Sequence, residues 1–364
     1  MFNAVSSLIS SLFDRGSSLS VPILDGALKP NNMIENATVV TERAGIEDMA
    51  LGPDGVLHLA CGKDVLKLSD KGEFTVAASF DRPVTALAFT AAGEIAVGLG
   101  NAVAVGSRIM DSADGKPFVA VNALSPTADG GLLITDGSTA RPYAQWSHDL
   151  LEAGRTGRLL RYDAASGRAV TLASGLGYAF GAMADARGRL VVSESWRHRL
   201  CVVEGGRTRE AVPALPGYPS RMSPTGDGGF WLTLFACRTQ LVEFVLQESD
   251  YRREMMRTID PQYWVAPALS SGNDYLEPLQ GGSVKQMGIL KPWAPPRSYG
   301  LAVRFDAEFR PLYSVHSRTG GRNHGIVAAV QRGDDLFLLS KGAGRVLRLS
   351  ASQIQSAWAK GTNE

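Results

Sequence analysis

One short pattern recurs six times along this chain: an apolar run, a turn that contains glycine, and a second apolar run. The copies occupy residues 49–62, 87–100, 124–137, 182–195, 222–235 and 327–342. The first five turn glycines are 38, 37, 58 and 40 residues apart. A period near 40 residues with a hairpin in each unit is typical of a propeller blade. The sequence therefore predicts an all-β, six-bladed β-propeller with its chemistry in the central channel.

The repeats predict one closed domain rather than the two or three that 364 residues would ordinarily suggest. We expect a lead-in over residues 1–40, one propeller over 41–350 and a C-terminal tail over 351–364. Apolar residues at helical spacing near the chain start predict a short helix in the lead-in. Two insertions, at about 138–156 and 247–298, break the repeat and are expected to cap one face as lids. Packing or subunit contact is the alternative interpretation of both insertions.

The charge, the apolar stretches and the cysteines of the chain limit the partners and the compartment that we expect. The chain has 37 basic and 36 acidic residues and no basic block, so a nucleic-acid partner is not expected. No stretch approaches the 18 apolar residues of a membrane span, and the first residues lack the features of a signal peptide. Cys61, Cys201 and Cys237 suggest buried thiols in a reducing, cytoplasmic compartment, with one disulfide and one free thiol as the alternative. The oligomeric state stays open.

The repeat also indicates where a site would lie. The strand nearest the axis comes first in each blade, so its opening residues should line one end of the channel. These openings contain Glu47, Asn122, Tyr178, Phe180, Ser220, Arg221 and His324.

The same residues lie among motifs that carry a family resemblance. Thr156–Leu160 reads TGRLL, Leu215–Pro219 reads LPGYP, and Ala44–Gly55 reads AGIEDMALGPDG. With these phrases, most of residues 25–350 resembles the strictosidine synthase-like family. The wider group includes paraoxonase-like and gluconolactonase- or regucalcin-like six-bladed propellers. The resemblance implies a six-bladed fold and favours ester or lactone hydrolysis of a small molecule.

Many hydrolytic members of that group hold calcium on the channel axis, and the resemblance implies which positions would ligate it. Glu47 matches the blade-one ligand, and Asn122 matches half of an Asn-Asp pair. Phe180 replaces an asparagine, and Ser220-Arg221 replaces an Asp or Asp-Asn. Calcium needs six to eight oxygen ligands. We therefore expect no cofactor and no metal, with Arg221 supplying the missing positive charge and pairing with Glu47. A weak calcium site would use Glu47 and Asn122.

The strictosidine synthase members themselves are expected to use a glutamate near the opening of blade six. Here that region reads NHGIVAAV without glutamate, and His324 lies there instead. The resemblance therefore does not predict Pictet–Spengler condensation. We assign Glu47 and His324 as candidate catalytic residues, with a structural ion pair and a satisfied polar histidine as the alternatives.

The remaining openings suggest substrate contacts. Asn122, Arg221 and Ser220 could bind polar groups, and Phe180 with Tyr178 would make part of the channel aromatic. Strand-end capping and core packing are the alternatives for these residues.

Three functions remain open. The first is an enzyme that acts on a small organic molecule by metal-independent acid–base chemistry, such as elimination, isomerisation or ring opening. The second is a non-catalytic ligand-binding or scaffold propeller with a plugged channel. The third is a calcium-dependent lactonase or esterase.

Overall fold

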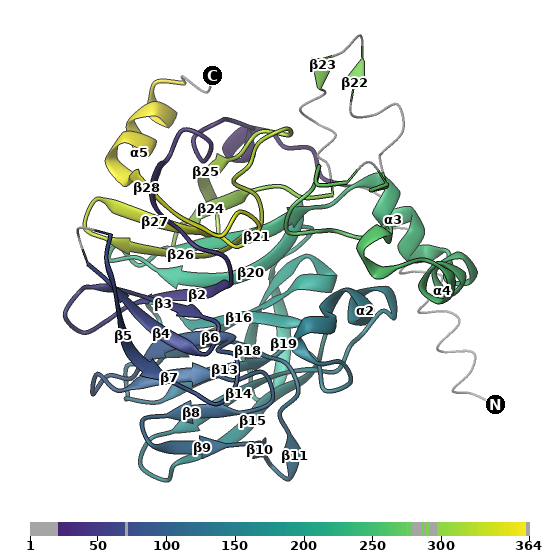
Figure 1. The fold of residues 1–364 in the computed structure, drawn as a ribbon. Coiled ribbons are helices and arrows are strands. Elements are labelled where there is room, and N and C mark those ends of the chain that lie inside the picture. Colours follow the sequence, from purple (N-terminus) through teal and green to yellow (C-terminus); the bar gives the residue numbers. More distant parts are fainter. Residues whose placement is uncertain are drawn as a thin grey trace.

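The protein is a ring of six four-stranded antiparallel sheets (Figure 1). The computed structural model describes residues 21–69, 72–274, 276–278, 285–286, 289–290 and 297–361. The first strands of successive blades contact one another around the axis. The six-bladed β-propeller expected from the repeats is therefore confirmed.

Each blade runs outward from its innermost strand. Blades one to three are β2 (Ile46–Leu51), β3 (Leu57–Cys61), β4 (Asp64–Leu68) and β5 (Phe74–Ser79); β6 (Ala86–Phe89), β7 (Ile95–Gly98), β8 (Val103–Val105) and β9 (Arg108–Met110); and β12 (Val121–Pro126), β13 (Leu132–Asp136), β14 (Gly157–Asp163) and β15 (Arg168–Leu176). Blades four to six are β16 (Ala179–Ala184), β17 (Leu190–Glu194), β18 (Arg199–Glu204) and β19 (Arg207–Val212); β20 (Gly217–Pro224), β21 (Phe230–Cys237), β24 (Leu301–Phe305) and β25 (Pro311–His316); and β26 (Ile326–Arg332), β27 (Asp335–Ser340), β28 (Arg345–Ser350) and β1 (Thr38–Glu42). Two short hairpins lie outside the blades: β10 (Ser112–Ala113) with β11 (Lys116–Pro117), and β22 (Lys285–Gln286) with β23 (Ile289–Leu290).

The two ends of the propeller meet in blade six. Strand β1 pairs antiparallel with β28, with Thr38 opposite Arg348 and Val39 opposite Leu347. The first strand in the described residues is thus the outermost strand of the last blade, and main-chain hydrogen bonds close the ring. Strand β1 begins inside the segment that the sequence assigns to the lead-in.

The repeated glycines have a conformational reason. Gly55, Gly93, Gly130, Gly188 and Gly228 all have φ between 74° and 87°. This left-handed region is open to glycine and strained for other residues. Each of these glycines lies between the first and second strands of its blade, so the sequence signal marks the inner hairpin.

Both insertions join the second and third strands of a blade. The first carries η2 (Tyr143–Gln145) and α2 (Trp146–Leu151) between β13 and β14. The second carries α3 (Gln240–Gln247), α4 (Ser249–Thr258) and η4 (Pro261–Tyr263) between β21 and β24. Because strands alternate in direction, these connections emerge at the end of the ring where the first strands begin. Figure 1 shows α2, α3 and α4 on one side of the ring.

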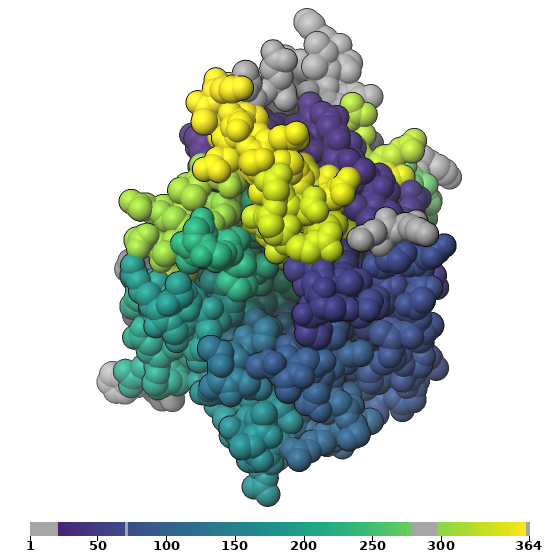
Figure 2. Space-filling view, turned by 90° about the vertical axis from the view of Figure 1, so that its left-hand side faces the viewer, coloured from purple at the N-terminus to yellow at the C-terminus, as the bar shows by residue number. Residues whose placement is uncertain are grey.

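The opposite face of the ring is the one away from α2, α3 and α4. Figure 2 shows it with the blades following one another around the ring in chain order. Three more helices complete the described fold: η1 (Gly26–Leu28), η3 (Ser195–Arg197) and α5 (Ala351–Ala359). The indole of Trp358 on α5 donates to the carbonyl of Ser314 at 3.0 Å, which anchors the C-terminal helix to blade five.

Several expectations concern the chain ends and the cysteines. The helix expected near the start of the lead-in lies outside the described residues. Cys61, Cys201 and Cys237 are buried and form no disulfide. Within the part of the chain that the structure describes, no helix has the length and apolar character needed to cross a membrane.

Candidate functional site

The channel openings are built on β-bulges, which turn side chains and carbonyls away from the ladder. In β2 the register moves from Ile46 opposite Cys61 to Asp48 opposite Ala60, so Glu47 is the extra residue. The same irregularity occurs in blades three to six, at Asn122, Phe180, Ser220-Arg221 and Val327. A bulge leaves one residue unpaired and re-aims its side chain. In this ring the bulges leave carbonyls free to face the axis.

Arg221 contacts main-chain carbonyls at the openings of four other blades. Its Nη2 donates to the carbonyls of Asn122 at 2.6 Å and Thr85 at 2.9 Å. Its Nη1 lies 3.3 Å from the carbonyl of Glu47 and 3.5 Å from that of Val327. The side chain starts in blade five and thereby contacts main-chain oxygens of blades one, two, three and six. The guanidinium is a fixed positive charge at the centre of the ring.

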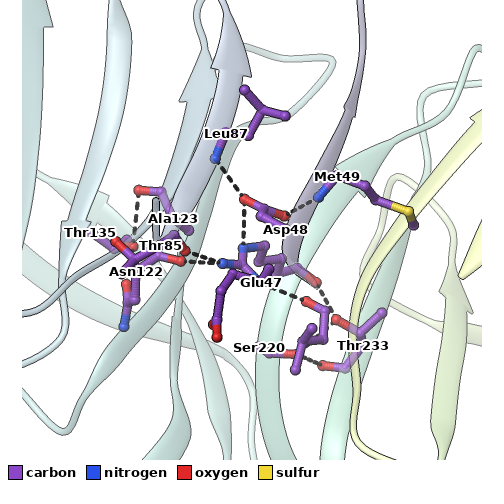
Figure 3. Close-up of polar contacts among 12 residues, drawn as sticks. Glu47, Asp48, Met49, Thr85, Leu87, Asn122, Ala123, Thr135, Ser220 and Thr233 are labelled. Carbon is purple, nitrogen blue, oxygen red and sulfur yellow. Dashed lines mark hydrogen bonds and ion pairs between the residues drawn. The ribbon is translucent and has the colours of Figure 1, made fainter. Parts of the chain in front are cut away.

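The carboxylate partner of Arg221 is Asp48. Arg221 Nε lies 3.1 Å from Asp48 Oδ2, and both side chains are buried. Asp48 also accepts hydrogen bonds from the amides of Met49 at 2.8 Å and Leu87 at 2.9 Å (Figure 3). Burial raises the pKa of Asp48 to about 6, although Arg221 and the two amides act to lower it.

The expected pairing of Arg221 with the Glu47 carboxylate is therefore wrong. Arg221 meets Glu47 only at its main-chain carbonyl. The physical reason is the bulge: it places the carbonyl of Glu47 and the side chain of Asp48 toward the guanidinium. Figure 3 shows the Glu47 carboxylate pointing away from this group of contacts.

Glu47 has partners of its own at the channel mouth. Its Oε2 accepts a hydrogen bond from the hydroxyl of Tyr143 at 2.7 Å and an ion-paired hydrogen bond from Lys341. Lys341 Nζ also lies 3.1 Å from the Tyr143 hydroxyl. Burial raises the pKa of Tyr143 well above its usual value and lowers the pKa of Lys341, which the Glu47 carboxylate acts to raise. We call these three residues the mouth cluster.

Beside the mouth cluster lies an aromatic pocket. Its lining is formed by Tyr143, Trp146, Tyr178, Phe180, Trp196, Phe235, Leu269, Val327 and Lys341. Its volume is about 20 Å³, close to the space needed by one water molecule. Tyr178 stacks on Trp196 at a centroid distance of 4.4 Å, and its φ of 58° is an uncommon, strained conformation for this residue type.

Phe180 separates the pocket from the channel below. Its ring centroid lies 5.3 Å from the guanidinium carbon of Arg221, and it lines the aromatic pocket, whereas Arg221 does not. Arg221 and Asp48 instead close a second cavity of about 190 Å³, which is lined by first-strand residues of all six blades. The channel is thus divided at the level of Phe180 and Arg221.

Asn122 and Ser220, which the sequence predicts to contact substrate, instead hydrogen-bond to other residues of the propeller. Asn122 is fully buried; its Nδ2 donates to the carbonyl of Ala179 at 2.9 Å, and its Oδ1 accepts from Thr135 Oγ1 at 2.6 Å. Ser220 is also fully buried, with its hydroxyl 2.7 Å from that of Thr233. Neither residue lines the aromatic pocket.

His324 lies at a different cavity from the mouth cluster. This cavity of about 620 Å³ lies between the blade-five insertion and the loops of blade six. His324 Nε2 lies 3.0 Å from the carbonyl of Arg318 and Nδ1 lies 2.7 Å from Ser298 Oγ. Because a carbonyl only accepts, Nε2 carries the proton and Nδ1 accepts from Ser298. Burial lowers the pKa of His324, which favours this neutral form. The pairing of Glu47 with His324 in one site is not supported.

The sequence reasoning missed Asp48, Tyr143, Lys341, Trp146, Trp196 and Phe235. Three of them could have been found from the position at which the second strand of a blade ends. The first and second strands of each blade are antiparallel, so the second strand ends at the channel mouth where the first strand begins. Ile326 lies opposite Ser340, and Ala179 lies opposite Glu194. Lys341 and Trp196 follow these partners closely, and Phe235 lies near the end of β21.

Metal ligands do not gather in the described part of the chain. Among residues 21–361, less those that the structure does not describe, no group of three or more His, Cys, Asp or Glu side chains could hold a metal ion.

The sequence matches several curated proteins. Strictosidine synthase-like protein 13 of Arabidopsis thaliana is 28% identical over 212 residues, which cover 57% of this chain and 46% of that protein. Strictosidine synthase-like protein 6 of the same plant is 31% identical over 129 residues, or 35% of each chain. Over these regions the chain is similar to the strictosidine synthase-like proteins. It spans less than half the length of the relatives it matches. No family model matches the sequence.

Similar solved structures agree with the fold. A gluconolactonase from Xanthomonas campestris superposes with a TM-score of 0.56 at 14% identity, covering 90% of this chain and 93% of that one. A luciferin-regenerating enzyme superposes with a TM-score of 0.50 at 12% identity, covering 88% and 94%. At this level of identity the likeness shows the propeller architecture alone.

The first prediction concerns the position of Arg221. We expect Arg221→Met to lower the free energy of unfolding by about 3–5 kcal/mol, because it leaves Asp48 buried without its ion-pair partner and several carbonyls without donors. Urea denaturation measures the loss. Arg253→Met is the control, because Arg253 is exposed on α4, and it should change stability by less than about 1 kcal/mol. A similar small loss in both variants would contradict the account.

The second prediction concerns Asp48 and pH. Because its pKa is about 6 when folded and 3.8 in a model peptide, the folded state binds more protons between these values. The contribution of Asp48 to the unfolding free energy should therefore fall as pH rises from 4 to 7, and Asp48→Asn removes this contribution. Relative to Asp48→Asn, the unsubstituted protein should lose up to about 3 kcal/mol over that range. If the unfolding free energies of the unsubstituted protein and of Asp48→Asn changed with pH by the same amount, the raised pKa of Asp48 would be refuted.

Proposed function

We propose that this protein is an enzyme that acts on a small organic molecule at the channel mouth, by acid–base chemistry that uses no metal. The observation that carries the proposal is the mouth cluster: a carboxylate held by an ammonium group and a phenol at the edge of an aromatic pocket. Desolvated titratable groups with shifted pKa values are common at catalytic sites. The relationship to strictosidine synthase-like proteins supports a small-molecule substrate.

The donors at the axis do not fit a calcium ion. The oxygens that could hold one are already hydrogen-bonded: Glu47 Oε2 by Lys341 and Tyr143, and Asn122 Oδ1 by Thr135. The carbonyls that face the axis receive the Arg221 guanidinium. A divalent cation would have to displace a positive charge and would meet the ring of Phe180. No step of the proposed reaction therefore passes through a metal.

The reaction class that suits these groups is ring opening of a lactone, or hydrolysis of an ester. Glu47 accepts a proton from water, and the resulting hydroxide adds to the carbonyl carbon. Lys341 and the Tyr143 hydroxyl are the donors available to the developing oxyanion. When the tetrahedral intermediate collapses, the leaving alkoxide takes the proton back from Glu47, which gives a hydroxy acid from a lactone, or an acid and an alcohol from an ester.

Binding without turnover is the second candidate, and one observation favours it. The aromatic pocket has a volume of only about 20 Å³, so a substrate ring enters only if the lining moves. A binding or scaffold propeller would need no such opening. The two candidates differ in whether Glu47 is required for product formation.

The third prediction separates them. We expect hydrolysis of at least one compound in a panel of aromatic lactones, sugar lactones and aryl esters, measured by proton release at pH 7–8. Glu47→Gln should lower kcat by about 100-fold or more, because it removes the proton acceptor. The circular dichroism spectrum of this variant should be unchanged.

Glu42→Gln provides the matched control. Glu42 is an exposed carboxylate on β1 that pairs with Arg345, away from the mouth cluster. Its substitution should leave turnover within about twofold, since exposed ion pairs contribute little. Equal activity in Glu47→Gln would exclude Glu47 as the base. Saturable binding with no turnover across the panel would favour the binding protein.

A further inference from the structure

Lys341 differs from the other residues around the aromatic pocket. Of the described side chains that line it, Lys341 is the single charged one; the others are aromatic or aliphatic. Its Nζ lies 5.0 Å from the centroid of the Tyr143 ring. A ligand that enters this pocket therefore meets one amine on an otherwise apolar wall.

The charges around Lys341 oppose one another. Desolvation lowers its pKa, and the positive charge of Arg221 acts in the same direction. The carboxylates of Glu47 and Asp48 act to raise it. An apolar site and a nearby cation both favour the neutral, nucleophilic form of a lysine, and the Glu47 carboxylate is placed to accept the Lys341 proton.

We propose that Lys341 forms an imine with an aldehyde or ketone whose ring packs among the aromatic side chains of the pocket. The inference rests on the proposed function, because it assigns a substrate class and a covalent step to the same mouth cluster. It adds a nucleophile to a site in which Glu47 moves protons.

The step balances without an oxidant or reductant. Glu47 takes one proton from the Lys341 ammonium, and the freed electron pair on Nζ attacks the carbonyl carbon. The carbonyl oxygen becomes a hydroxyl as the proton returns through Glu47 or Tyr143. Loss of water from this carbinolamine gives the imine, so one amine and one carbonyl yield one imine and one water.

Geometry supports each of these transfers. The Glu47 carboxylate and the Tyr143 hydroxyl both lie within hydrogen-bond distance of Lys341 Nζ. Phe180, Tyr178 and Trp196 form one wall against which a ring can pack. The volume of about 20 Å³ requires that Trp146 and Leu269, which belong to the two insertions and are only partly buried, move outward to admit it.

Reductive trapping tests the proposal. The protein is incubated at pH 7 with benzaldehyde and sodium cyanoborohydride, and benzylated lysines are quantified by peptide mass spectrometry over time. We expect Lys341 to react at least about tenfold faster than Lys63 and Lys360, which are exposed lysines in the same chain. Propanal in place of benzaldehyde should reduce this preference, because it does not fill the aromatic pocket.

Two variants make the result specific. Lys341→Arg keeps the positive charge beside Glu47 but cannot form an imine, so labelling at this position should vanish while Lys63 and Lys360 react as before. Glu47→Gln removes the neighbouring carboxylate, so the pH at which Lys341 reacts at half its maximal rate should move lower. An unchanged pH dependence in Glu47→Gln would contradict the role given to this carboxylate in the step.

The outcomes separate this inference from the proposed function. Labelling of Lys341 no faster than that of Lys63 and Lys360 overturns the imine, even if lactone turnover depends on Glu47. Fast labelling of Lys341 with no turnover of any lactone or ester supports the imine and overturns the hydrolytic proposal.

Discussion

The buried guanidinium of Arg221 links the blades at the centre of this propeller. Arg221 reaches from blade five and hydrogen-bonds main-chain carbonyls at the openings of blades one, two, three and six. Asp48 balances its charge from within the ring. Buried carbonyls and a buried carboxylate are costly when they lack donors. This one side chain contacts carbonyls of four blades and pairs with the Asp48 carboxylate.

The contacts of Arg221 also determine which partners remain for the side chains at the channel mouth. Because Arg221 is engaged with carbonyls and with Asp48, the Glu47 side chain is left to Lys341 and Tyr143. Phe180 lies over the guanidinium and lines the aromatic pocket, so a ligand that enters this pocket from the insertion side meets aromatic rings and the mouth cluster before it reaches Arg221. The two cavities of the channel are therefore chemically separate: one aromatic with an amine, one closed by an ion pair.

The fold could be predicted from sequence because the signal is local and repeated. Each inner hairpin needs a glycine in the left-handed region, and the innermost strands need apolar runs, so six copies of one pattern specify six blades. The position of the innermost strand in each blade also predicts that Glu47, Tyr178, Phe180 and Arg221 lie at one end of the channel. The partners of these side chains could not be predicted in this way. A β-bulge changes which of two neighbouring residues faces inward, as with Asp48 and Glu47.

Other parts of the site depend on contacts that no spacing encodes. Tyr143 lies in an insertion that is 96 residues away from Glu47 in the chain, and Lys341 is 294 residues away. Asn122 has the residue type of a ligand, yet its amide links blade three to blade four. His324 lies at a blade opening, yet its ring bonds to Ser298 from the blade-five insertion. Such pairings are decided by how the blades and insertions pack.

We propose that the Arg221 guanidinium takes the place of a metal cation at the channel axis. The most direct test is the metal content of the purified protein, together with its melting temperature in calcium and in chelator. If the dissociation constant for calcium were one-hundredth of the added calcium concentration, binding would stabilise the folded state by about 2.7 kcal/mol. A stabilisation of this size would be visible as a change in melting temperature. We expect no stoichiometric metal and no shift between the two conditions. One bound calcium per chain and a clear fall in melting temperature with chelator would contradict the account.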